Sequence, residues 1–175
     1  PQVLTYFEEQ GDPLVIVWPQ GAKTLTVNVE NSLGGKVLGG GQYFEGRSVS
    51  LKAVPAPGYL FDHWTDGITI VMSANDSDNS YTAVFKRGTL ISVDLPEGIS
   101  LGVMLNNMGN GPWTVEQGSQ CTLSVNIYYR AANGELALSL NGESCNLTQQ
   151  NGAYEYTFEA KGQEMKFKLD YIAQQ

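Results

Sequence analysis

His63 is the only histidine of the 175-residue chain, so a Ser-His-Asp or Cys-His catalytic arrangement would have to use its imidazole. It stands between Asp62 and Trp64, in a segment whose aromatic residues are expected to pack into a core. No nucleophile motif accompanies it. We therefore interpret His63 as a strand or loop residue without a catalytic role, and we predict that the chain is not an enzyme.

Metal ligation has two candidate residue sets. A structural zinc site needs four well-spaced ligands, whereas the chain offers one histidine and two cysteines, Cys121 and Cys145, with no C-x-x-C pair. The run NDSDN at residues 75–79 offers several oxygen ligands of the kind that calcium prefers. It lacks the glycine and the terminal glutamate of an EF-hand loop, which favours a simple hairpin loop. Asp76 and Asp78 are the candidate ligands, and we predict no cofactor.

Paired carboxylates would support glycoside hydrolysis if a cleft held them about 5 to 10 Å apart. The candidate acids are Glu8, Glu9 and Glu159. They fall in glycine-containing segments that we predict to be hairpin turns, where acidic side chains are normally solvated. We assign them no catalytic role.

Aromatic residues in polar surroundings are the candidates for ligand binding. Trp113 follows the Gly- and Asn-rich stretch 106–112, and Tyr128 has the strand parity of polar neighbours. Either ring could stack on a sugar or contact a side chain of a protein partner. Trp113 also matches the place of Tyr43 before the glycine of its unit, which favours core packing. For Tyr128 both interpretations stay open.

Charge and apolar content limit the partners. The net charge is −8, and no Lys or Arg lies between Arg87 and Arg130, so a nucleic acid partner is excluded. The longest apolar runs, such as Leu14 to Trp18, are too short to span a bilayer. The sequence opens at Pro1, and we expect it to be part of a longer chain. The two cysteines fit either one bridge or two small buried side chains.

The elements that must position these residues are strands. Apolar and polar residues alternate with a period of two in six segments, which are 24–29, 48–53, 81–85, 120–129, 154–158 and 165–171. Turn-forming pairs such as Asp66-Gly67, Asn133-Gly134 and Asn151-Gly152 separate them. This pattern predicts an all-β protein made of sheets, a sandwich or a small barrel.

Internal repeats organise these strands. FEEQGDPLVIV (residues 7–17) and FEAKGQEMKFK (residues 158–168) align without gaps, and we interpret both as hairpins with the glycine in the turn. KTLTVNV (residues 23–29) and GTLISVDL (residues 88–95) each open a new unit. Apolar residues follow Gly46 and Gly118 at the same offsets of three, five and seven; they are Val49, Leu51 and Ala53 in one unit and Cys121, Leu123 and Val125 in the other.

The matches define a register of domains. Residues 1–22 form a β-hairpin that belongs to a preceding module or completes a sheet of the first unit. Residues 23–87 form a first β module, and residues 88–175 form a second, diverged β module.

Within the first unit, the string GGKVLGGGQYFEGRSVSLKAVPAPGYLFDHWTDG followed by YTAVFK resembles the divergent internalin-type B repeat of bacterial surface proteins, over about residues 33–86. The second unit departs from it, because Leu140 stands where Trp64 would be. The resemblance implies a small β-grasp-like or related β module that is repeated in tandem in exported bacterial proteins and carries no catalytic residues.

The aromatic residues of this string also carry a prediction of their own. Tyr59, Phe61 and Trp64 cannot all face one side of a regular strand, so the segment must turn or bulge to bury the last two together. Trp64 is then expected to be a core anchor.

We therefore expect a non-catalytic repeat segment of a secreted or cell-surface bacterial protein, acting as a spacer or adhesion module through protein or glycan contacts. The alternative is an accessory carbohydrate-binding domain of a secreted glycan-processing system that uses Trp113 and Tyr128.

Overall fold

The computed structural model describes residues 3–6, 14–17, 23–44, 48–65, 70–71, 79–109, 111–130, 133–150 and 152–173. These residues form strands and turns and contain no helix, which confirms the all-β prediction.

The strands fall into two groups and a preceding pair. The pair is β1 (Val3–Tyr6) and β2 (Leu14–Val17), which are antiparallel. The N-terminal sheets contain β3 (Lys23–Val29), β4 (Gly35–Leu38), β5 (Gly41–Tyr43), β6 (Ser48–Val49), β7 (Lys52–Pro55), β8 (Tyr59–Trp64), β9 (Ile70–Val71) and β10 (Asn79–Arg87). The C-terminal sandwich contains β11 (Thr89–Asp94), β12 (Ile99–Leu105), β13 (Met108–Gly109), β14 (Trp113–Val115), β15 (Gln120–Arg130), β16 (Gly134–Leu140), β17 (Glu143–Cys145), β18 (Thr148–Gln150), β19 (Ala153–Glu159) and β20 (Glu164–Ala173).

The N-terminal sheets comprise one mixed sheet and two short strand pairs. The mixed sheet has the order β5-β3-β10-β8, with β3 and β10 parallel at its centre, and the pairs are β4-β7 and β6-β9. Buried Ala83 and Phe85 of β10 pack with Val37 of β4 and Ala53 of β7. The strand pairs therefore cover the mixed sheet, and alternate residues of β10 form the core between them.

The C-terminal sandwich has two five-stranded sheets, β14-β11-β20-β16-β17 and β13-β12-β15-β19-β18. One hydrophobic cluster fills the space between them. Phe167 of β20 is 1% exposed, and its ring centroid lies 4.8 Å from that of Phe158 on β19. The apolar sides of alternating strands from the two sheets thus meet face to face.

The two groups share a topology. In each, the first strand pairs in parallel with the last (β3 with β10, β11 with β20), and a short antiparallel strand (β5 or β14) flanks the first. An antiparallel strand, β8 or β16, flanks the last. Both groups therefore have a central parallel pair between antiparallel neighbours.

The strand register supports the glycine-based alignment of the two units. Ala53 lies opposite Val37, and Val125 lies opposite Val103. Cys121, Leu123 and Val125 are all 0% exposed, so the predicted core-facing slots of the second unit are confirmed, including the one that holds a cysteine. The limits of the domains at residues 22 and 87 stay a prediction.

The predicted hairpin at residues 158–168 is wrong. Its two strands, β19 and β20, lie in different sheets, and the chain crosses between the sheets at buried Ala160. The backbone N–H of Ala160 donates to the carbonyl of Ser119, and its carbonyl accepts from the N–H of Gly118. Alternating apolar residues fit two strands that face each other across a core as well as two paired strands, so the pattern did not distinguish them. For residues 7–17, Leu14–Val17 does pair with Val3–Tyr6, and residues 7–13 lie outside the described part of the chain.

The predicted bulge in the aromatic segment is confirmed. On β8, Trp64 faces Ala83 and Phe61 faces Phe85, and the register shifts between them so that Asp62 has no partner. This extra residue brings Phe61 and Trp64 to one side, with ring centroids 5.3 Å apart. Trp64 is partly buried at the edge of the cluster, so it supports the core rather than filling its centre.

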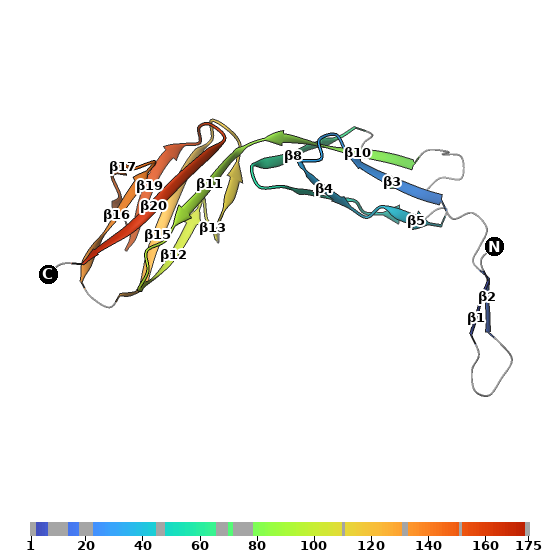
Figure 1. The fold of residues 1–175 in the computed structure, drawn as a ribbon, viewed down its shortest axis with the longest axis horizontal. Coiled ribbons are helices and arrows are strands. Elements are labelled where there is room, and N and C mark those ends of the chain that lie inside the picture. Colours follow the sequence, from blue (N-terminus) through green and yellow to red (C-terminus); the bar gives the residue numbers. More distant parts are fainter. Residues whose placement is uncertain are drawn as a thin grey trace.

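The two groups follow each other directly along the chain. Strand β10 ends at Arg87 and β11 begins at Thr89, so Gly88 alone separates them. Figure 1 shows the N-terminal sheets and the C-terminal sandwich end to end, with β10 running into β11.

Candidate functional site

The single histidine belongs to a row of exposed charged residues on β8, on β10 and directly after β14. His63 Nδ1 lies 2.8 Å from Asp62 Oδ2, and the His63 side chain is 58% exposed. Lys86 Nζ lies 3.4 Å from Asp62 Oδ1 and 2.8 Å from Glu116 Oε1. The His63 hydrogen bond, followed by Lys86, lowers the pKa of Asp62, and Glu116, followed by Asp62, raises the pKa of Lys86. The arrangement is an ion-pair network on an open surface.

Metal binding finds little support in the described residues. Among them, no group of three or more His, Cys, Asp or Glu side chains is placed to hold a metal ion. The candidate ligands Asp76 and Asp78 lie outside the described residues. Glu8 and Glu9 also lie outside them, and Glu159 forms an ion pair with Lys161 at 3.4 Å.

The cysteines are free thiols on opposite sheets. Cys121 is on β15 and fully buried, whereas Cys145 is on β17 and partly buried. Burial raises the pKa of the Cys121 thiol, which favours the protonated, unreactive form.

Trp113 is a core residue of the sandwich. It is 7% exposed, and its indole N–H donates to the carbonyl of Met108 at 3.1 Å. It faces Ile91 on β11, as Gly41 faces Leu25 on β3, so it replaces a glycine of the first unit rather than Tyr43. Core packing is thus confirmed for Trp113. Trp113 also borders a hollow of about 350 Å³, together with residues of β11 and β12.

Tyr128 is placed very differently. It lies near the end of β15 and is 72% exposed. Ser100 of β12 faces Tyr129, and Leu101 faces Ile127, so Tyr128 is the extra residue of a bulge. Tyr129 is 66% exposed. The structure therefore does not bring Trp113 and Tyr128 together; it pairs Tyr128 with Tyr129. Two adjacent tyrosines at the end of an alternating strand were the signal in the sequence, because strict alternation would bury one of them.

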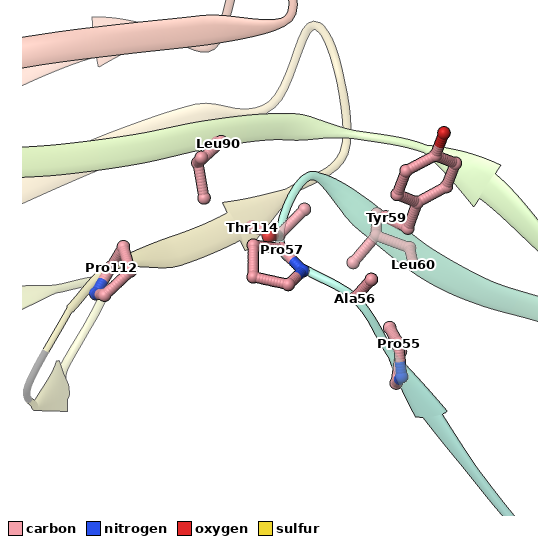
Figure 2. Close-up of a pocket in the computed structure, with 8 residues that line it drawn as sticks. All are labelled: Pro55, Ala56, Pro57, Tyr59, Leu60, Leu90, Pro112 and Thr114. Atoms are coloured by element: carbon pink, nitrogen blue, oxygen red, sulfur yellow. The ribbon is translucent and has the colours of Figure 1, made fainter. Parts of the chain in front are cut away.

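A second site, not foreseen from the sequence, lies where the two groups meet. A hollow of about 340 Å³ is lined by Pro55, Ala56, Pro57, Tyr59, Leu60, Leu90, Pro112 and Thr114. Figure 2 shows these side chains around the turn between β7 and β8 and the adjoining β14 and β11. The hollow is mainly apolar, with prolines from both groups on its walls. Its residues come from three segments that are more than 20 positions apart in the chain, which is why local patterns did not reveal it.

Hydrogen bonds close this junction on one side. The N–H of Gly58 donates to Thr114 Oγ1 at 3.0 Å, and the carbonyl of Gly58 accepts from the N–H of Gly88 at 3.0 Å. Next to them, the Arg87 guanidinium lies 5.0 Å from the centre of the Tyr59 ring. The Lys86 to Glu116 ion pair crosses the same boundary. The described contacts thus join one turn of the N-terminal sheets to β14 and the start of β11.

Comparisons with known proteins bear on the first group. A search of the curated proteins and a search of the solved structures gave no match. Among the described residues, no helix is long and apolar enough to cross a membrane. A family model, that of the divergent InlB B-repeat domain, matches residues 25–89. Over this segment, which contains the motif residues 33–86, the chain therefore matches a family of repeat modules of the kind that bacterial surface proteins carry, as the sequence resemblance predicted.

Proposed function

We propose that the chain is a non-catalytic repeat segment of an exported bacterial cell-surface protein, in which it acts as a spacer or adhesion module through protein or glycan contacts. Residues 23–87 and 88–175 are its two tandem modules. The observation that carries the proposal is the connection between them. The last strand of one module continues through Gly88 into the first strand of the next, without a linker.

A spacer must hold its ends at a defined separation, and flexible linkers defeat this purpose because their end-to-end distance varies widely. Gly88 is bonded through its N–H to Gly58, and Gly58 is bonded to Thr114 on the far side of the boundary. A rotation of one module about Gly88 would break the Gly58 to Thr114 bond and the Lys86 to Glu116 pair. These contacts support a fixed angle between the modules.

The non-catalytic part of the proposal is supported by the state of the candidate residues. His63 is hydrogen-bonded to its sequence neighbour Asp62 on an open surface, and Cys121 is buried with the pKa of its thiol raised by that burial. Catalytic groups normally lie together in a cleft.

The spacer function can be tested with spin labels. Cysteines replace Thr26 on β3 and Lys166 on β20, both exposed, in a Cys145→Ser background that keeps the buried Cys121 unlabelled. Double electron-electron resonance should give a narrow distribution of distances between the two labels. The matched control inserts four Gly and Ser residues after Arg87 and should broaden it. A distribution that is equally broad in both proteins contradicts the spacer function. In the producing bacterium, antibodies against the chain should label intact cells.

A further inference from the structure

Strand β15 carries a row of uncharged polar side chains on the face that points away from the core. The row consists of Thr122, Ser124 and Asn126, which alternate with fully buried residues. Thr157 of β19 lies opposite Thr122 with the two hydroxyl oxygens 3.2 Å apart, and Glu155 lies opposite Ser124. In the described part of the chain, the side chains of Ser124 and Asn126 have no hydrogen-bond partner. They are free to bind an external polar group.

Tyr128 ends this row, and its ring is held against the sheet. A methyl group added at Gly102 would lie 2.5 Å from Tyr128 Oη and 2.6 Å from its Cε2, so the ring covers the bare backbone of this glycine on β12. Because Tyr128 is still 72% exposed, its other side faces solvent. An aromatic ring fixed in this way loses little conformational entropy when a ligand stacks on it.

A hollow adjoins the ring at the same end of the sheet. Its volume is about 350 Å³, and it is lined by Ile127, Tyr128, Tyr129, Gln149, Gly152 and Tyr154. The amide of Gln149 supplies both a donor and acceptors, and the tyrosines supply hydroxyl groups. Tyr154 lies opposite buried Val125, and Gln149 lies opposite Tyr154, so both belong to the core-facing side of the sheet at this end. The Tyr128 ring therefore stands between this hollow and the polar row of the outer face.

Charge restricts the ligand class. Glu155 and Glu159 are acidic, and Arg130 at the end of β15 is the only basic residue in strands β13, β12, β15, β19 and β18. The chain carries a net charge of −8, so anionic ligands are repelled. A protein partner would need apolar side chains around an aromatic anchor, whereas the outer-face row that leads to Tyr128 consists of the hydroxyl and amide side chains of Thr122, Ser124 and Asn126.

We propose that the outer face of the β12-β15-β19 strands binds a neutral saccharide, with Tyr128 as the stacking platform and Ser124, Asn126 and Glu155 as hydrogen-bonding groups. Sugar C–H groups would lie on the free side of the ring, and sugar hydroxyls would bond to the polar row. This proposal rests on the proposed adhesion function and specifies the class of ligand for that function.

Affinity electrophoresis of the complete chain tests the site. The gels contain a neutral polysaccharide (β-glucan, xylan or mannan) or anionic polygalacturonate. At least one neutral polysaccharide should retard the chain, and polygalacturonate should not. Tyr128→Ala should raise the dissociation constant obtained from the gels at least tenfold, and Asn126→Ala should raise it several-fold. Tyr128→Phe should change it little. Ile172→Ala is the matched control, because Ile172 is 60% exposed on the opposite sheet. This variant should be retarded as strongly as the parent chain. Circular dichroism and thermal melting establish that each variant is folded.

Three outcomes would overturn the saccharide site: no retardation by any neutral polysaccharide, equal retardation of a folded Tyr128→Ala variant, or stronger retardation by polygalacturonate. The spin-label measurement is independent of these gels. A narrow distance distribution without retardation in the gels would refute the saccharide site and support the spacer function. Retardation in the gels with a broad distance distribution would support the saccharide site and refute the spacer function.

Discussion

The Thr114 hydroxyl oxygen accepts a hydrogen bond of 3.0 Å from the backbone N–H of Gly58, 56 residues earlier in the chain. Gly58 lies in the turn between β7 and β8 with a φ of +82°, a conformation that favours glycine. The same turn accepts the N–H of Gly88. A single turn of the N-terminal sheets therefore binds both β14 and the connection between the two groups.

Replacing Thr114 with Val should loosen this junction. The substitution keeps the shape of the side chain and removes the acceptor of the Gly58 N–H, which should lower the free energy of unfolding by about 0.5–1.5 kcal/mol. It should also broaden the spin-label distance distribution. Thr114→Ser, which keeps the hydroxyl, is the control and should retain the narrow distribution. Equal distributions in Thr114→Val and the parent would show that this bond does not fix the angle.

Gly88 should tolerate no side chain. A Cβ at this position would lie 2.6 Å from the carbonyl oxygen of Val115 and 2.8 Å from Thr114 Cγ2, so the backbone of β14 would have to move. We expect Gly88→Ala to destabilise the chain by about 1–3 kcal/mol, the usual cost of overpacking. Gly109→Ala is the matched control, because a Cβ there meets nothing within 4 Å. Urea unfolding of the two variants gives the comparison, and similar stabilities would argue against a close approach of β14 to Gly88.

The two large aromatic clusters should respond unequally to truncation. Phe167 is 1% exposed and packs against Phe158 and Tyr156. Phe167→Ala should therefore cost about 3–5 kcal/mol. Trp64 is only partly buried, so Trp64→Ala should cost less than this range, even though its side chain is larger. Denaturant unfolding followed by circular dichroism measures both. A larger loss of unfolding free energy for Trp64→Ala than for Phe167→Ala would show that Trp64 is the main core anchor.

Much of the fold follows from local patterns in the sequence. Alternation is enough to predict strand β15 and the buried positions of Cys121 and Leu123, because a period of two fixes which side of a strand is buried. The bulge at Asp62 also follows from local spacing, since Phe61 and Trp64 cannot otherwise share a side. Which strands pair with each other is harder to predict from local patterns. The residues around Phe158 and Met165 alternate equally well in a hairpin and in two facing sheets, and only the long-range core packing distinguishes them.

The candidate site was only half predictable for a similar reason. Tyr128 is identified by its polar neighbours, but the ring is positioned by Gly102 on another strand, which no local motif indicates. Trp113 has the same polar sequence context as a surface aromatic residue. Its burial depends on β14 lying against Ile91, a contact between separate strands.

The charge network of Asp62, Lys86 and Glu116 predicts a pH dependence at both ends of the range. The pKa of Lys86 is raised above its usual 10.5 in the folded state, so its contribution to stability is complete below pH 10.5 and is lost as the pH rises through the raised pKa. The pKa of Asp62 is lowered below its usual 3.8, so its contribution is present above pH 3.8 and is lost as the pH falls through the lowered pKa.

Two variants separate these contributions. Lys86→Gln should reduce the loss of stability above pH 10.5, and Asp62→Asn should reduce the loss below pH 3.8, in urea unfolding measured across both windows. All of these groups are exposed, so the differences should be small and should shrink in high salt. Parallel stability curves for Lys86→Gln and the parent above pH 10.5 would contradict this assignment.

The two thiols should differ in reactivity. Cys121 is 0% exposed, and burial, only partly offset by a hydrogen bond from Asn106, raises the pKa of its thiol above the usual 9.0. The lack of exposure keeps reagents away from the sulfur atom, and the raised pKa reduces the fraction of thiolate, the form that attacks disulfide reagents. Cys145 is partly buried on β17, near the hydroxyl group of Tyr156. At pH 8 we expect a chromogenic disulfide reagent to modify Cys145 in the folded chain and both thiols after unfolding in urea. Cys145→Ser should remove the reaction of the folded chain, whereas rapid modification of that variant would show that the core around Cys121 opens to solvent.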